Sequence, residues 1–218
     1  INWNDGYIDL SGGGQTLTNN GILNLIGTNL SNFTCSMAIV NTGTVNKTAG
    51  TLTITQALTN QAAGTVTVST GASLTFTSGV ITQSGTFTVD GTVSLSGSSH
   101  TFNTNFSGTG TLNISANSTV TAASGFAPAV ATVNHNSTLS AGAGTALTIP
   151  SGTTWNWAGD FGNFTGITND GTLNITTNSN HNTGANVTNN AGKTINWNDG
   201  YIDLSGGGQT LTNNGIFN

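Results

Sequence analysis

Residues 64–95 read GTVTVSTGASLTFTSGVITQSGTFTVDGTVSL, and this stretch decides the fold. After Gly64 and again after Gly85, apolar and polar residues alternate, which is the pattern of a strand with one buried and one solvated face. Glycines separate the runs, and glycine permits positive φ and the sharp bends at which a chain changes direction. The stretch therefore predicts short strands joined by tight turns.

The same pattern recurs along the chain at an interval of about 22 residues, which suits a solenoid coil of three short strands and three turns. Each coil can bury its apolar face only by stacking on its neighbours. We therefore expect an all-β fold, a parallel β-helix (β-solenoid) with about 22-residue coils of three short strands. The interval blurs between residues 110 and 171, where two or three coils with an insertion are expected. The leading glycines are Gly21, Gly43, Gly64, Gly85, Gly110, Gly171, Gly192 and Gly215.

Alternation after the glycines also predicts which side chains point inward, because successive residues of a strand face opposite sides. These expected core residues are Leu52, Ile54, Val66, Val68, Leu74, Phe76, Phe87, Val89, Leu112, Ile114, Leu173 and Ile175.

A longer repeat contains the short one. Residues 1–24 and 195–218 are identical except that Leu23 corresponds to Phe217, at an offset of 194 residues. We interpret residues 1–194 as one tandem unit of a continuous solenoid and residues 195–218 as the start of the next. Neither end resembles a polar capping repeat, so we expect units to continue one another as a rod, with the chain itself as partner, head to tail.

Composition narrows the function classes. The chain has 42 Thr, 31 Asn and 31 Gly, and 4% charged residues against about 25% in ordinary domains. Its net charge is −5 with Lys47 and Lys193 as the cations, so nucleic acid is not an expected partner, and low charge favours side-by-side packing of rods. Apolar runs are too short for a membrane-spanning helix. Cys35 is alone in the sequence, which favours a buried thiol over an intermolecular disulfide.

Asparagine keeps a fixed place two residues before the leading glycine. Stacked coils would bring these amides above one another, where they can share hydrogen bonds as an asparagine ladder. The alternative is that Asn is simply a favourable turn residue. The expected ladder residues are Asn19, Asn41, Asn169, Asn190 and Asn213, with Gln83 as a substitute.

Coils of this length with turn asparagines and an N-x-G-T-[LV]-x-[IV] pattern resemble the pectin-lyase-like β-helix superfamily. Within it, the chain is similar to the β-strand-repeat regions of giant bacterial surface proteins of the filamentous-haemagglutinin type. The resemblance covers the whole chain and implies a secreted or surface-displayed protein with an adhesive, biofilm or sheath role. The superfamily also contains polysaccharide lyases and hydrolases, so the fold alone does not decide function.

One aromatic motif carries a binding hypothesis. The stretch NWNDGYIDL occurs at residues 2–10 and 196–204, with a looser echo, WNWAGDF, at residues 155–161. Its rings could stack on sugar rings of surface glycans; alternatively they pack coil corners while Asp-Gly forms a turn. The candidate glycan-stacking residues are Trp3, Tyr7, Trp155, Trp157, Trp197 and Tyr201.

Catalytic patterns are weak. Asp5 and Asp9, repeated as Asp199 and Asp203, are the paired carboxylates; a glycosidase needs two about 5 to 9.5 Å apart, and Ca²⁺ needs more oxygen ligands than two. There is no arginine for a lyase site. No catalytic residue, cofactor or metal site is expected, and we expect no enzyme activity. The three histidines lack metal-ligand spacing and are expected at turns or on the surface: His100, His135 and His181.

The leading functional hypothesis is a structural part of an extracellular or cell-surface fibre, sheath or adhesin. A polysaccharide-binding or polysaccharide-degrading β-helix protein is one alternative. The other is an ice-binding solenoid, suggested by Thr-x-Thr pairs that could form a flat hydroxyl array. These pairs are Thr51/Thr53, Thr65/Thr67, Thr75/Thr77 and Thr86/Thr88.

Overall fold

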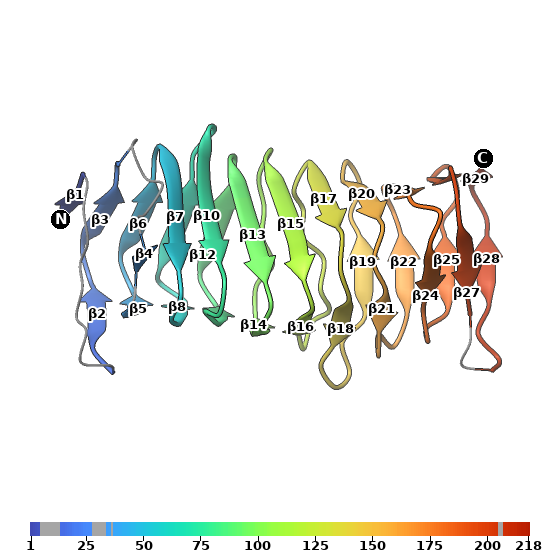
Figure 1. The fold of residues 1–218 in the computed structure, drawn as a ribbon, viewed down its shortest axis with the longest axis horizontal. Helices are drawn as coiled ribbons and strands as arrows, with labels where there is room; N and C mark the ends of the chain where they lie inside the picture. Colours follow the sequence, from blue (N-terminus) through green and yellow to red (C-terminus); the bar gives the residue numbers. More distant parts are fainter. Residues whose placement is uncertain (5–13, 28–33, 36, 205–206) are drawn as a thin grey trace.

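The computed structural model describes residues 1–4, 14–27, 34–35, 37–204 and 207–218. Within these ranges the chain forms strands and no helix, and its coils stack along one long axis with the two termini at opposite ends (Figure 1). Paired residues of consecutive coils are 18 positions apart at Trp155 and Leu173 and 24 apart at Val187 and Leu211. The expected all-β parallel solenoid is confirmed, with coils of about 21 residues.

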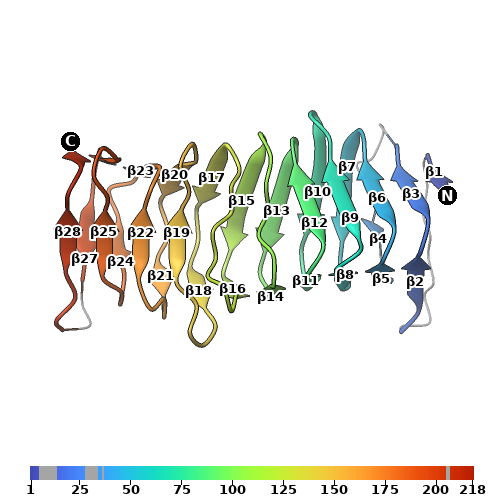
Figure 2. The ribbon, with the colours of Figure 1, turned by 180° about the vertical axis from the view of Figure 1, so that it is seen from behind.

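Each coil has three sides, and all the strand pairs of the described residues are parallel, so the sides build three faces that run the length of the molecule (Figures 1 and 2). Face 2 is a single ten-stranded sheet. Its strands are β4 (Thr34–Cys35), β7 (Gly50–Ile54), β10 (Ala72–Phe76), β13 (Thr92–Ser96), β15 (Thr111–Ala116), β17 (Thr132–His135), β20 (Thr154–Trp157), β23 (Thr172–Ile175), β26 (Thr194–Trp197) and β29 (Ile216–Phe217).

Face 3 combines an eight-stranded sheet with a two-stranded sheet, linked by the bridge between Phe161 and Thr183. Its strands are β2 (Thr16–Asn19), β5 (Ala38–Asn41), β8 (Leu58–Asn60), β11 (Ile81–Gln83), β14 (Ser99–Phe102), β16 (Ser118–Thr121), β18 (Leu139–Ala141), β21 (Phe161–Gly162), β24 (Asn180–Asn182) and β27 (Tyr201–Asp203).

Face 1 combines a five-stranded and a four-stranded sheet. Isolated parallel bridges from Thr88 to Ser107 and on to Ala129, and from Phe126 to Leu147, carry this face across the interval between them. Its strands are β1 (Asn2–Trp3), β3 (Ile22–Leu25), β6 (Thr44–Lys47), β9 (Thr65–Val68), β12 (Thr86–Val89), β19 (Leu147–Ile149), β22 (Ile167–Asn169), β25 (Val187–Asn189) and β28 (Leu211–Asn213).

The core is one continuous column between the three faces. All twelve side chains expected to point inward are buried, so the predicted strand register is confirmed. Where face 1 is interrupted, phenylalanines fill the interior. The Phe106 ring lies 4.8 Å from Phe87 and 4.9 Å from Phe102, and Phe102 lies 5.2 Å from Phe126. The blurred interval holds three coil steps on face 2, from β15 through β17 and β20 to β23.

Two kinds of glycine shape the coils. Gly71 and Gly152 have the positive φ expected of corner glycines, at 80° and 85°. The leading glycines are needed for a different reason. A Cβ at Gly85 would lie 2.0 Å from the Gly64 carbonyl oxygen, and one at Gly43 would lie 2.1 Å from that of Gly21. Stacked glycines therefore let successive coils approach closely at this corner. Gly43 and Gly85 are required by the lack of space for a Cβ and not, as expected, by a positive φ.

This close approach predicts a large difference between two Gly→Ala substitutions. Gly85→Ala should destabilise the protein by about 2 kcal/mol or more, because its methyl group meets backbone that has no room to move. Gly166→Ala is the matched control, since a Cβ there meets no atom within 4 Å. Urea unfolding followed by circular dichroism measures both, and equal midpoints for the two variants would contradict the argument.

Candidate functional site

Buried amides form a ladder along the corner that follows face 3. Asn19 Nδ2 donates to Asn41 Oδ1 at 2.7 Å, Asn41 to Asn60 at 2.8 Å, and Asn60 to Gln83 Oε1 at 3.0 Å. These four side chains are buried. Strand pairing holds them in register, because Asn19, Asn41, Asn60 and Gln83 occupy the same position of four consecutive strands.

A second inner ladder lies on face 1 near the C-terminal end. Asn169 Nδ2 donates to Asn189 Oδ1 at 2.7 Å, and Asn189 donates to Asn213 at 2.7 Å. Backbone carbonyls take part as well: Asn189 also donates to the Lys193 and Ile216 oxygens. Each ladder amide thus joins one coil to the next and satisfies turn carbonyls at the same time.

Asn190 is not a ladder residue, contrary to the expectation. Its neighbour Asn189 pairs with Asn169 and Asn213 in the strand register, while Asn190 Nδ2 donates to the Asp170 carboxylate at 2.7 Å. The turn after Asn189 is two residues longer than the turn after Asn169, so counting back two positions from Gly192 selects the wrong residue. The long turn after Asn60 hides that ladder residue in the same way.

A further asparagine ladder lies on the outer surface of face 2. From the second asparagine onward, each Nδ2 donates to the Oδ1 of the asparagine in the preceding coil, at 2.8 to 2.9 Å. The first, Asn113, donates to Ser94 Oγ at 3.5 Å. The sequence signal for it is the repeated T-x-N at strand starts, where Asn occupies an outward position that any polar residue could take. The members of this outer ladder are Asn113, Asn134, Asn156, Asn174, Asn196 and Asn218.

The inner and outer ladders should differ in their contribution to stability. Asn41→Ala removes bonds to Asn60, Gly43 and Thr65 and leaves buried carbonyls unpaired, so we expect a loss of about 2 to 4 kcal/mol. Asn156→Ala in the outer ladder is the control, because water can replace its partners, and its loss should stay near 1 kcal/mol. Chemical denaturation of both variants measures the difference; a larger loss at Asn156 would refute the distinction.

The tryptophans do not form the surface that glycan stacking requires. Trp155 and Trp157 point inward from β20 and are fully buried, and Trp3 is also buried. Trp157 Nε1 donates to the Gly159 oxygen at 2.6 Å, so it packs a corner. Trp197 and Tyr201 are 40% and 61% exposed, on the last coil. Tyr7 lies outside the described residues, as do Asp5 and Asp9 of the carboxylate pair.

The three histidines lie in the core and not at turns or on the surface, which corrects the expectation. His100 Nδ1 accepts the Ile81 amide at 3.1 Å, and His135 packs with ring centroids 4.5 Å from Phe161. Burial lowers the pKa of His100 to about 4. Burial also lowers the pKa of His135 to about 3, outweighing nearby Asp160, which raises it. His181 packs against Trp157. Alternation with Phe102 and Val133 places His100 and His135 inward, whereas His181 has only polar neighbours in its strand.

These histidines predict acid sensitivity. The unfolded chain takes up protons below pH about 6.5, whereas folded His100 and His135 stay neutral until about pH 4 and 3, so protonation favours unfolding in between. Stability should fall as the pH drops through this window, by about 2 kcal/mol per histidine at pH 5. Denaturation midpoints from pH 7 to 5 measure this, and the double variant His100→Leu/His135→Leu should flatten the profile. An unchanged slope in the variant would assign the effect elsewhere.

Lys47 is a buried cation on the inner side of β6. Its neighbours in register are Leu25 and Val68, and its Nζ donates to the Ala49 carbonyl oxygen. Burial lowers the pKa of this ammonium to about 8. The side chain belongs to the interior and is not presented to a substrate.

The threonine pairs divide between two faces. On face 1, Thr65 lies opposite Thr86 and Thr67 opposite Thr88, which gives a small aligned hydroxyl patch. The other two pairs lie on face 2 and are offset by two residues, because Thr53 and not Thr51 lies opposite Thr75. The four pairs therefore do not form a single flat array.

Within the described residues, no three His, Cys, Asp or Glu side chains lie close enough to hold a metal ion. Asp203 accepts from Asn180 Nδ2, and Asp199 accepts its neighbour's backbone amide. No helix in the described ranges is long and apolar enough to span a membrane.

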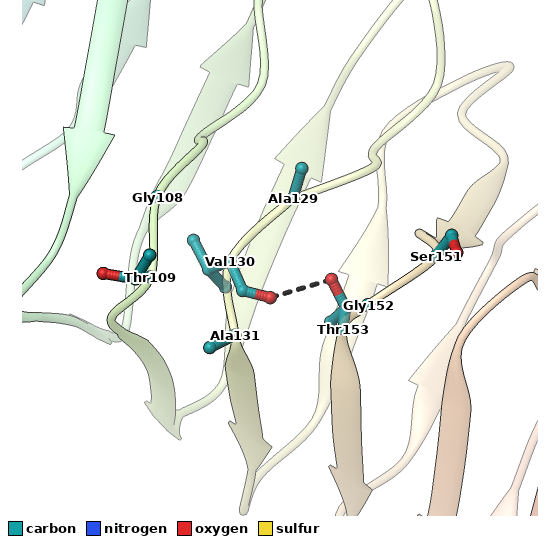
Figure 3. A pocket seen from close by; sticks show the side chains of 8 residues that line it. All are labelled: Gly108, Thr109, Ala129, Val130, Ala131, Ser151, Gly152 and Thr153. Carbon is teal, nitrogen blue, oxygen red and sulfur yellow. Dashed lines mark hydrogen bonds between the residues drawn. The ribbon is translucent and has the colours of Figure 1, made fainter.

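A groove of about 270 Å³ crosses three coils at the corner between faces 1 and 2 (Figure 3). Its polar side chains are hydroxyls, and Thr153 Oγ1 donates to the Val130 carbonyl at 2.8 Å. Charged side chains lie next to the groove: the Asp90 carboxylate accepts from Thr109, and Lys193 Nζ donates to Ser151 Oγ at 3.5 Å. It is lined by Gly108, Thr109, Ala129, Val130, Ala131, Ser151, Gly152 and Thr153.

No protein-family model matches the chain, and no curated protein or solved structure shows significant similarity to it. The fold and the amide ladders are therefore the observations from which a function can be proposed.

Proposed function

We propose that this chain is a structural building unit of an extracellular fibre, sheath or adhesin, made from tandem β-solenoid units. The proposal rests on one observation: side-chain amides form hydrogen bonds from each coil to the next. The inner amides bond Asn19 to Asn41 and onward, and the outer amides bond Asn113 to Asn134 and onward. Groups arranged in this way stabilise a rod.

Composition and resemblance support the same proposal. A chain with 4% charged residues offers little repulsion between neighbouring rods, which favours bundles or sheaths. The resemblance of the N-x-G-T-[LV]-x-[IV] pattern to β-strand-repeat regions of bacterial surface proteins of the filamentous-haemagglutinin type supports a location outside the cell. A role in adhesion or biofilm structure follows from that resemblance, with the chain itself as the principal partner and surface glycans as a secondary one.

An ice-binding solenoid is the second candidate, favoured by the aligned hydroxyls of Thr65, Thr67, Thr86 and Thr88 on face 1. This patch covers two coils. On the two preceding strands, Asn46 and Asn24 occupy the position of Thr67, and Thr44 and Ile22 occupy the position of Thr65. A thermal-hysteresis measurement on the purified chain separates the two proposals. The polysaccharide-binding or polysaccharide-degrading alternative has less support, because three of the candidate glycan-stacking residues, Trp3, Trp155 and Trp157, are buried.

The proposal predicts where the protein is found. Antibodies raised against residues 1–218 should decorate filaments or a surface layer on intact cells of the source, as seen by immunogold electron microscopy. Antibody absorbed with the purified chain is the control. Labelling that requires permeabilised cells, with none outside, would contradict the extracellular role.

A further inference from the structure

The two copies of the 24-residue segment show the junction between tandem units from both sides. The described residues of the second copy, 195–204 and 207–218, stack on the coil before them, and those of the first copy, 1–4 and 14–24, stack on the coil after them. If the copies have the same conformation, the two stackings can be joined by superposing one copy on the other. This inference rests on the proposed function, because it requires the unit to be repeated.

Matching hydrogen bonds show that the described parts of the copies share one conformation. The Asn24 amide donates to the Ile1 carbonyl at 2.8 Å, as the Asn218 amide does to Ile195 at 3.0 Å. At the corner, Asn19 Nδ2 donates to the Gly21 oxygen at 3.3 Å, and its counterpart Asn213 donates to Gly215 at the same distance.

The outward amides agree as well. Asn24 Nδ2 donates to Asn2 Oδ1 at 2.7 Å, and Asn218 Nδ2 donates to Asn196 Oδ1 at 2.9 Å. The strand offset is also the same, because Asn2 pairs with Asn24 and Ile195 pairs with Phe217, each 22 residues later. The last coil can therefore be replaced by the first coil of a following unit.

The copies nevertheless lie on different faces of the solenoid. Strands β1 and β3 belong to face 1, but their counterparts β26 and β29 belong to face 2. Strand β2 belongs to face 3, and its counterpart β28 belongs to face 1. Superposing the copies thus requires a rotation of one side, a third of a turn.

Counting strands gives the same result. Face 3 contains ten strands from β2 to β27, which are nine coil steps, and β28 follows β27 one side further along the chain. Because β28 is the counterpart of β2, one 194-residue unit comprises nine and one-third coils.

We propose that tandem units form one uninterrupted solenoid in which each unit is rotated by a third of a turn relative to the one before. With a spacing of about 4.8 Å per coil, the rise is about 45 Å per unit and about 135 Å for the three units that restore the orientation. Each sheet then continues into the next unit as a different face: face 2 of one unit, for example, continues as face 1 of the next.

The ladders continue across this junction without a gap. Asn213, the acceptor of Asn189, takes the place of Asn19, the donor to Asn41, so the two inner ladders become one. The outer ladder runs through Asn196 and Asn218 in the places of Asn2 and Asn24, and on to Asn46, which donates to Asn24. The junction therefore has the same bonding as the interior of a unit.

The test is cryo-electron microscopy of a chain with six tandem copies of residues 1–194 followed by residues 195–218. We expect straight rods with a rise of about 45 Å and a rotation of a third of a turn per unit. The matched control deletes residues 92–110 from every unit, which removes one coil because Thr92 pairs with Thr111. Its rise should shorten to about 40 Å with the rotation unchanged.

Rods whose units repeat without rotation would overturn this inference while leaving the fibre proposal intact. Globular units joined at variable angles would overturn it as well, whereas failure of extracellular labelling would affect only the proposed function. A two-unit chain gives an independent measurement by acrylamide quenching. The single chain has 4 tryptophans with Trp197 exposed. By the same count, the two-unit chain has about seven tryptophans. If the units stack continuously, only the counterpart of Trp197 at the far end is exposed, so acrylamide should quench about one tryptophan in seven. Quenching of about two in seven would refute continuous stacking.

Discussion

The parallel register between coils is the constraint on which the rest of this structure depends. Each residue lies directly above and below its counterparts in neighbouring coils, about 4.8 Å away. Every side chain must therefore be compatible with the side chain at the same position of the next coil. Charged groups repel their copies at this distance, which explains a composition with 4% charged residues. Asparagine suits the constraint because its amide both donates and accepts, and glycine suits it where backbones meet.

Much of the fold could be predicted because alternation and glycine spacing are local signals. Inward positions such as Val66 and Leu112 follow directly from the period of two in a strand. Turn length is less visible in a single sequence. The longer turns after Asn60 and Asn189 increase the distance between the ladder residue and its glycine. Counting back two positions from the glycine therefore selects the wrong residue, whereas the strand register identifies the ladder residue.

Side-chain type was the less reliable guide to the candidate site. Trp155 and Trp157 are large enough to suggest a binding surface, yet they fill the core beside Phe161. His100 is polar and was expected at a turn or on the surface, although its place in an alternating strand puts it inside. The outer amides on face 2 were missed because six similar polar residues acquire a common role only when stacking aligns them.

The direction of the bonds between coils has a mechanical consequence. In this molecule the hydrogen bonds that join strands lie along the axis of the rod, and the covalent chain runs around it (Figure 1). Tension applied to the two ends therefore loads these bonds a few at a time, by peeling, and not all together in shear. Each coil that opens releases about 21 residues, or about 70 Å of extended chain, in place of about 5 Å of rod. Under load, such a rod lengthens in many small, equal steps and dissipates energy at each one, as an extensible tether does.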